Sequence, residues 1–147
     1  MIKLYFDSCI YNRPFDDQTQ SIIQNETNAI IDIINYTQQN NICIYSSAIV
    51  KLELEKNENS DKKIQVQLFY DSLKTKNIQF NIKINDRAKE LGKQYNIKYK
   101  DGLHIAYCEL ENIDYLITTD KNFINASARA NLKLKVTNPK DYIEGGE

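Results

Sequence analysis

The chain has 147 residues, a length typical of one domain that buries a hydrophobic core of its own. Apolar residues make up 41% and charged residues 27%, and the net charge of −1 argues against a protein that coats nucleic acid non-specifically. No apolar run approaches the ~20 residues of a membrane span. Cys9, Cys43 and Cys108 form no CxxC pair, which argues against a zinc site or redox dithiol, and we expect a cytoplasmic protein.

The first half of the chain predicts strands and helices in alternation. Short apolar runs are typical of buried strands, and apolar residues at helical spacing are typical of amphipathic helices. A proline with neighbouring acids indicates a loop. In chain order we expect a strand at 2–6, a loop at 11–17, a helix at 21–39, a strand at 42–45, a helix that Ser46 or Ser47 can cap, and a helix at 60–74.

The second half continues the alternation. We expect a strand at 78–84, helices at 86–95 and from about 101, strands at 115–118 and 132–136, and a C-terminal tail at about 138–147. Strands that alternate with helices indicate a parallel sheet with helices packed on it. The sequence therefore predicts one α/β domain over 1–147, with a central parallel sheet of four or five strands flanked by helices on both faces.

Four acidic residues fall where the carboxyl end of such a sheet would bring them together. Asp7 and Asp120 follow two of the predicted strands, and ligands of open parallel sheets bind beyond the strand ends, where the strand order reverses. Asp101 stands where an N-cap or first-turn acid of a helix belongs. Glu53 lies within the first two turns of the helix that follows the second strand. We expect all four to converge on one crevice.

Such a cluster of carboxylates indicates a bound cation. Like charges at close range repel one another in a partly buried site, so the cluster survives only if protonated or bound to metal. Oxygen ligands favour Mg²⁺ or Mn²⁺, and these ions support phosphodiester hydrolysis. No GxSxG setting accompanies the lone His104, and no GxGxxG or Walker loop is present.

Four segments resemble, in order and spacing, the motifs of the PIN-domain family. They are the strand end Phe6-Asp7-Ser8-Cys9-Ile10, the Ser-x5-Glu segment SAIVKLE at 47–53, the helix start DGLHIA at 101–106, and the strand end LITTDKNF at 116–123. The resemblance covers residues 2 to about 137. Gly102 departs from the alanine usual in the family, which costs helix propensity.

The resemblance implies a PIN-like fold and a metal-dependent nuclease, commonly an endonuclease of single-stranded RNA. Many family members are toxins of bacterial toxin-antitoxin pairs (VapC-like proteins). It further implies Mg²⁺ or Mn²⁺ as cofactor, an antitoxin partner, and a homodimer that buries apolar side chains from the helices between residues 22 and 74. The catalytic and metal-binding acids of the family map onto Asp7, Glu53, Asp101 and Asp120, and its supporting hydroxyl maps onto Ser8 or Thr119.

Two further side chains each allow two interpretations. Arg13 is the best candidate for a contact with an RNA phosphate, because a guanidinium binds phosphate in a bidentate manner. Its alternative is a structural ion pair with Asp16 or Asp17. His104 is predicted to pack and to bond within the surroundings of its own helix, rather than to take part in the site.

Two other functions are compatible with a fold of this kind. A non-catalytic PIN-fold module would bind RNA or protein without needing a divalent ion, so a metal titration separates it from a nuclease. A phosphoacceptor domain of the receiver type would need paired acids at the first strand and a lysine near the last. Only Lys121 is available for that role, and it is misplaced.

Overall fold

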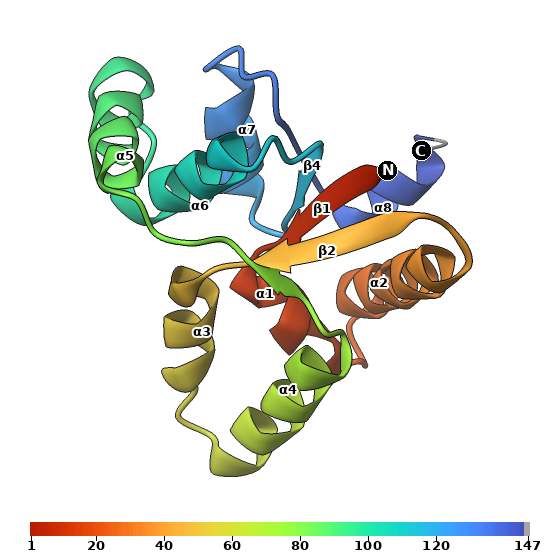
Figure 1. Ribbon diagram of the computed structural model, residues 1–147. Helices are drawn as coiled ribbons and strands as arrows, with labels where there is room; N and C mark the ends of the chain where they lie inside the picture. Colours follow the sequence, from red (N-terminus) through yellow and green to blue (C-terminus); the bar gives the residue numbers. More distant parts are fainter. Residues whose placement is uncertain (146–147) are drawn as a thin grey trace.

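A five-stranded parallel sheet runs through the centre of the protein in a computed structural model that describes residues 1–145 (Figure 1). The strand order is β3-β2-β1-β4-β5, and every neighbouring pair is parallel. The strands are β1 (Ile2–Phe6), β2 (Ile42–Ser46), β3 (Lys76–Asn77), β4 (Tyr115–Ile117) and β5 (Lys135–Thr137). The predicted parallel sheet of four or five strands is confirmed.

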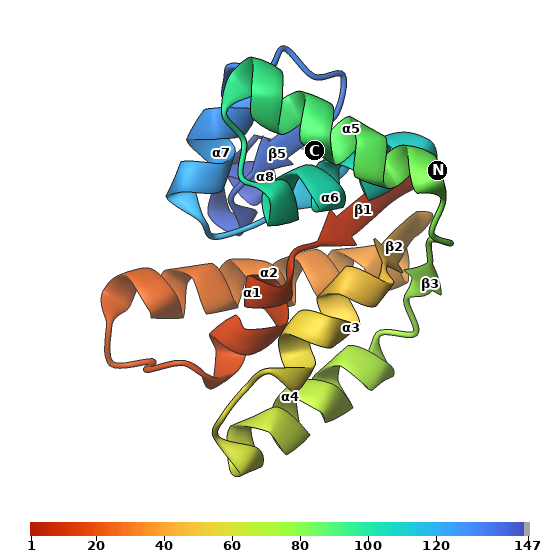
Figure 2. The same ribbon diagram turned by 90° about the vertical axis from the view of Figure 1, so that its left-hand side faces the viewer.

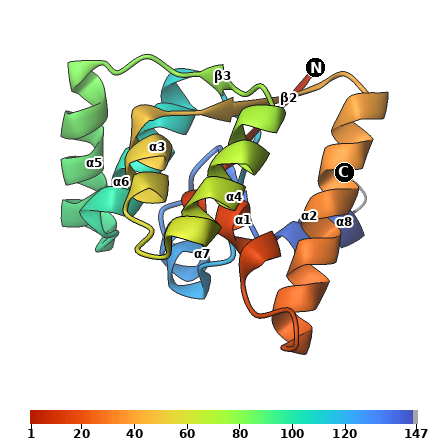
Figure 3. The ribbon, with the colours of Figure 1, turned by 90° about the horizontal axis from the view of Figure 1, so that it is seen from below.

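Helices cover both faces of this sheet, as predicted. They are α1 (Ser8–Asn12), the 3-10 helix η1 (Arg13–Phe15), α2 (Ser21–Gln39), α3 (Ala48–Glu55), α4 (Ser60–Ser72), α5 (Ile82–Tyr95), α6 (Tyr99–Leu110), α7 (Lys121–Ala128) and α8 (Pro139–Glu144). The chain runs outward from β1 to β3, then returns to β4 and continues outward to β5. Because parallel crossovers are right-handed, this reversal places α1–α4 on one face and α5–α7 on the other (Figure 2). Figure 3 shows α3, α4, α1 and α2 across the first face.

The core is densest at the carboxyl ends of β1 and β4. Tyr5, Phe6 and Ile117 are fully buried, as expected for strands covered on both faces. The ring of Tyr11, directly below in α1, contacts the rings of Phe6 and Tyr70 edge to face, with centroids 5.8 and 5.0 Å apart. This packing fixes α1 and α4 under the end of β1, where Asp7 follows.

The prediction of a strand at 78–84 is wrong. The third strand is only β3, and the chain is already helical at Ile82. Of the alternating apolar residues, Ile78 is buried, whereas Phe80 and Ile82 are 59% and 66% exposed, so no core faces them. Asn81 accepts a hydrogen bond from the backbone N–H of Lys83 and caps α5, which starts this helix four residues earlier than predicted.

Three other segments also differ from their predictions. The loop expected at 11–17 is largely helical, because Asp7 caps α1 and Pro14 lies in the first turn of η1. β5 begins at Lys135, where it pairs with Tyr115 of β4, rather than at residue 132. The expected C-terminal tail forms α8, which Asn138 caps and which packs on α2; residues 146–147 lie outside the described chain.

Gly102 is explained by the contact between α5 and α6. A Cβ atom at this position would lie 3.1 Å from the carbonyl oxygen and 3.2 Å from the Cα of Ala88 in α5. Both distances are tighter than ordinary packing, and both atoms belong to the backbone. The missing side chain therefore allows α5 and α6 to approach closely, which offsets the low helix propensity of glycine.

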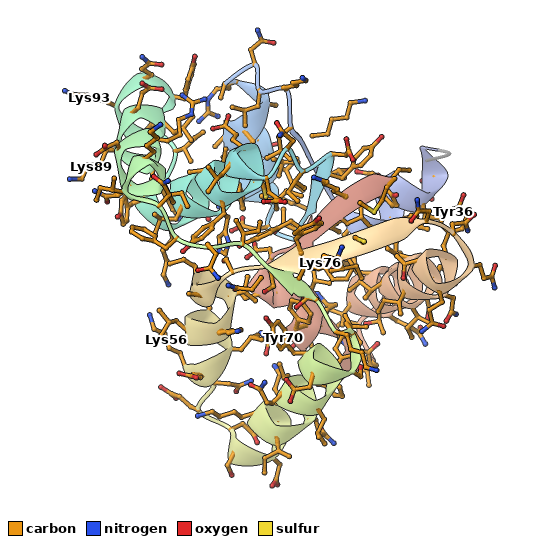
Figure 4. The ribbon with its side chains drawn as sticks, viewed as in Figure 1. Tyr36, Lys56, Tyr70, Lys76, Lys89 and Lys93 are labelled. Carbon is orange, nitrogen blue, oxygen red and sulfur yellow. The ribbon has the colours of Figure 1, made fainter. Side chains whose placement is uncertain are left out.

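The outer surface carries both lysines and large apolar side chains. Lys89 and Lys93 point away from the body of the protein on α5 (Figure 4). Within the described residues, no helix combines the length and apolar character needed to cross a membrane. Exposed large apolar side chains on α2, α3 and α4 are Ile22, Ile31, Tyr36, Leu52, Ile64 and Leu68.

Truncation of the buried strand β4 should be far more costly than truncation of an exposed helix position. We expect Leu116→Ala to lower the free energy of unfolding by about 2–5 kcal/mol, because it leaves a cavity in a fully buried site. Leu68→Ala, at a position that is 65% exposed, should change it by no more than about 0.5 kcal/mol. Urea denaturation measures both, and equal losses would contradict the central place of β4.

Candidate active site

Asp7 is held rigidly at the junction of β1 and β4. Its backbone N–H donates to the carbonyl oxygen of Ile117 at 3.0 Å, which continues the strand pairing one residue beyond β1. Its Oδ1 accepts from the N–H of Ser8 at 2.7 Å and caps α1, while Oδ2 accepts from Oγ1 of Thr118 at 2.8 Å. A carboxylate that is only 8% exposed is thus oriented through both of its oxygens.

Thr118 connects Asp7 with Asp120. Its buried hydroxyl donates to Asp7 and accepts from the backbone N–H of Asp120 at 3.2 Å. Oδ1 of Asp120 caps α7, accepting from the N–H groups of Asn122 and Phe123, and the residue itself is exposed. The end of β4 therefore brings these two acids together through one side chain.

Of the two hydroxyls predicted to support the acids, that of Ser8 donates to Asp7 Oδ1 at 3.5 Å and lowers the pKa of Glu53 through a hydrogen bond. The hydroxyl of Thr119 accepts from Arg13. Thr118 was missed, although it is the threonine of the L-x-T-x-D pattern that starts at Leu116. That motif position was the available signal.

Asp101 completes a group of three interacting acids. It is the third residue of α6, and Lys98 is the N-cap, so Asp101 is a first-turn acid rather than the cap. Burial, followed by the negative charges of Asp7 and Asp120, raises the pKa of Asp101 from 3.8 to about 6. This pKa marks a place where negative charge is not neutralised by the protein.

Glu53 approaches the same place from α3, on the opposite face of the sheet. Its Oε1 accepts from Nε2 of His104 at 2.9 Å, and its Oε2 lies 3.7 Å from the ammonium group of Lys100. Burial raises the pKa of Glu53, but the hydrogen bond from His104 and the charges of His104 and Lys100 outweigh it, so this pKa is lowered overall. Glu53 is therefore a carboxylate at neutral pH.

His104 lies inside the site, and the prediction that it bonds only around its own helix is wrong. The ring is 1% exposed, with Nε2 at 3.4 Å from Oδ1 of Asp7 and Nδ1 at 2.7 Å from the hydroxyl of Tyr5. Burial lowers the pKa of His104, but the bond to Glu53 and the nearby carboxylates outweigh it and raise this pKa. The helical spacing from Asp101 was the only local sign of this placement.

The donor atoms present fit a divalent cation. Among the residues described, one ligand atom each from Asp7, Glu53 and His104 lie within 4.8 Å of one another. Asp101 lies outside this group, yet its raised pKa shows that it interacts with the charges of Asp7 and Asp120. A partly buried set of carboxylate oxygens of this kind suits Mg²⁺ or Mn²⁺.

Arg13 forms a structural network at the edge of the site. Its guanidinium donates to Oδ2 of Asp16 at 3.1 Å and to Oγ1 of Thr119 at 2.8 Å, and its Nε lies 3.1 Å from Oε1 of Glu26. The ion pair with Asp16 confirms the structural alternative. The network joins η1, α2 and the loop before α7, so the predicted phosphate contact would have to compete with three existing partners.

Removal of the Arg13 guanidinium should destabilise the fold. We expect Arg13→Ala to lower the free energy of unfolding by about 3 kcal/mol, because it leaves the buried carboxylate of Glu26 without its ion pair. Arg129→Ala, which removes an exposed guanidinium with one weak contact to the carbonyl of Tyr95, is the matched control. An Arg13→Ala protein of unchanged stability that loses only RNA binding would instead support the phosphate contact.

The three interacting acids Asp7, Asp101 and Asp120 should make the metal-free protein less stable as pH rises. The raised pKa of Asp101 means that the folded state binds its proton more tightly than the unfolded state, so this stabilisation is complete below about pH 4 and is lost through about pH 6. Asp101→Asn cannot ionise, so in chelator it should melt a few degrees above the wild type at about pH 7.5 and alike at about pH 4. A difference independent of pH, or one matched by exposed Asp32→Asn, would contradict this coupling.

Comparisons with known proteins identify the family of the chain and a similar fold. The family model described as PIN domain matches residues 5–128. None of the curated protein sequences compared with the chain matches it. A solved structure with a similar fold is the crystal structure of VapBC2 from Rickettsia felis bound to a DNA fragment from their promoter. A chain of that structure is 17% identical to this one, with a TM-score of 0.63 over 93% of this chain and 98% of that chain.

The structural likeness at this level of identity concerns the fold, and it supports the PIN-like arrangement of the sheet and helices. The family match carries the assignment further. It extends over most of the sequence and includes Asp7, Glu53, Asp101 and Asp120. The chain therefore belongs to the PIN domain family.

Proposed function

We propose that this PIN domain is a metal-dependent endoribonuclease that cleaves single-stranded RNA, with Mg²⁺ or Mn²⁺ as its cofactor. We further propose that it is the toxin of a toxin-antitoxin pair. The family assignment supports a nuclease. The observation that carries the proposal is geometric: ligand atoms of Asp7, Glu53 and His104 lie within 4.8 Å of one another at the point where the strand order reverses. Burial, followed by the charges of Asp7 and Asp120, raises the pKa of Asp101 at the same place.

The side chains of the site suit phosphodiester hydrolysis. A bound divalent cation would offset the charge of the acids and of the phosphate and would supply Lewis acidity. Asp7 is oriented for this by Ser8 and Thr118, and Glu53 by His104. Such preorganised ligands need little rearrangement when a substrate arrives.

Local charge supports a nucleic-acid substrate despite the net charge of −1. Lys98 and Lys100 flank the first turn of α6, and Lys121 directly follows Asp120; all three are exposed. Ammonium groups around an acidic centre can hold the phosphates on either side of the bond to be cleaved. A single strand is favoured because its backbone can bend to bring one phosphate to the acids at the end of the sheet.

We also propose two protein partners, a second copy of this chain and an antitoxin. The exposed apolar side chains of α2, α3 and α4 are suitable for burial in a homodimer and against an antitoxin. The likeness to a chain of the Rickettsia felis VapBC2 structure is compatible with an antitoxin partner. A cytoplasmic location would agree with three cysteines that are all free thiols.

Replacement of Asp7 should abolish cleavage without damaging the fold. We expect purified protein to cleave a single-stranded RNA pool with Mn²⁺ or Mg²⁺, to lose this activity in EDTA, and to regain it when the metal is restored. Asp7→Asn should be inactive under all these conditions. Its thermal stability without metal should equal or slightly exceed that of the wild type, because repulsion among the acids is relieved.

An exposed acid provides the control for this experiment. Asp86→Asn, on the outer side of α5, should cleave like the wild type. RNA cleavage that persists unchanged in EDTA, or in Asp7→Asn, would overturn the metal-dependent mechanism. Protein that binds RNA but cleaves none with any divalent ion would instead be a non-catalytic binding module.

A further inference from the structure

A chain of buried hydrogen bonds runs from the core to the candidate site. The hydroxyl of Tyr5 lies 2.7 Å from Oγ of Ser47 and 2.7 Å from Nδ1 of His104. The other ring nitrogen, Nε2, lies 2.9 Å from Oε1 of Glu53. Tyr5 and Ser47 are fully buried and His104 is 1% exposed, so each polar atom depends on the next for a partner.

At a pH where the ring of His104 is neutral, the donor and acceptor capacities of these groups fix the direction of the chain. The Glu53 carboxylate can only accept, so Nε2 of His104 must carry a hydrogen atom. Nδ1 of the neutral ring is then an acceptor and takes the hydroxyl proton of Tyr5. The Tyr5 oxygen in turn accepts from the hydroxyl of Ser47, and every group is satisfied.

The Nε2–H group lies between two acids from different elements. It is 2.9 Å from Glu53 on α3 and 3.4 Å from Oδ1 of Asp7 at the end of β1. Two carboxylates alone would repel one another, and Glu53 reaches the site from a helix, with His104 and the Ser8 hydroxyl as its hydrogen-bond donors there. The Nε2–H group bonds to Glu53 and lies close to Asp7, so it keeps ligand atoms of the two acids within 4.8 Å of one another.

We propose that Tyr5 and Ser47 hold the ring of His104 in place through Nδ1 while Glu53 takes the proton of Nε2, and that His104 is thereby a positioning residue that holds Glu53 beside Asp7 for one divalent cation. The role of this arrangement in cation binding rests on the proposed metal-dependent function. The arrangement itself is a property of the metal-free protein. It assigns a role to three buried residues that touch neither substrate nor the scissile bond.

The competing arrangement makes His104 a ligand. Its Nε2 would then have no hydrogen atom, Nδ1–H would donate to Tyr5, and Tyr5 would donate to Ser47. The two arrangements differ in the proton on Nε2. His104 is the only histidine in the sequence, so ¹⁵N labelling of histidine yields one ring to observe.

Nitrogen NMR therefore tests the proposal directly. In the full-length protein at about pH 8 we expect Nε2 to carry a proton, both without metal and after addition of Mg²⁺. Tyr5→Phe should leave the proton on Nε2, where Glu53 requires it, but should shift the Nδ1 resonance, because it removes the hydrogen bond to Nδ1. An Nε2 without a proton in the metal-free protein, or one that loses it when Mg²⁺ binds, would overturn the proposal.

Metal affinity tests the positioning role. Tyr5→Phe should weaken Mn²⁺ binding, measured by calorimetry, by about tenfold, as is common when a residue that orients a ligand is removed. The matched control is Tyr70→Phe, which removes another buried tyrosine hydroxyl, one that donates to the neighbouring Ser46 at 2.9 Å. His104→Gln, which keeps a donor, should bind Mn²⁺ more tightly than His104→Leu.

These measurements separate this proposal from the proposed function. A Tyr5→Phe protein that keeps both the wild-type histidine spectrum and the wild-type Mn²⁺ affinity would overturn the positioning role, even if the wild type cleaves RNA. An equal loss of affinity in Tyr70→Phe would also overturn it, since the effect would then be general softening of the core. If the wild type leaves RNA intact while Tyr5→Phe still weakens Mn²⁺ binding, the proposed nuclease function is overturned and the positioning role of His104 stands.

Discussion

The pairing of β1 with β4 is the constraint on which the candidate site depends. Phe6 lies opposite Ile117, and the N–H of Asp7 continues this pairing by donating to the Ile117 carbonyl. The next residue of each strand, Asp7 and Thr118, therefore meet beyond the sheet. The strand order also reverses here, so helices diverge to opposite faces and leave the strand ends accessible. A shift of one residue in this register would turn Asp7 to the other face.

The site concentrates negative charge that the protein only partly offsets. Lys100 and His104 offset the charge of Glu53, whereas burial and the charges of Asp7 and Asp120 outweigh those of His104 and Lys98 at Asp101 and raise its pKa. Such a cluster lowers the stability of the metal-free protein, a cost typical of sites built to bind cations. The hydrogen bonds of Asp7 with Ser8 and Thr118 hold this carboxylate in place against the repulsion.

Local patterns were sufficient wherever one element determined its own structure. The helical spacing over 21–39 predicted α2 with its observed bounds, and strong apolar runs predicted β1 and β2. The strand at 78–84 failed because alternation is meaningful only if one face meets a core, and Phe80 and Ile82 meet none. A capping residue, Asn81, decided that segment against the apolar pattern, and Asn138 likewise caps α8, where the sequence analysis expected only a tail.

The sequence by itself determined the fold class, the parallel sheet, and the positions of Asp7 and Asp120 after strands, because these depend on periodicity and order along the chain. Only the tertiary structure decided which side chains meet across elements. Tyr5 and His104 are 99 residues apart, and Arg13 and Thr119 are 106 apart, so no local pattern encodes either contact. Their partners follow from the strand register and from the face that α6 turns to β1, which are set when the whole core packs.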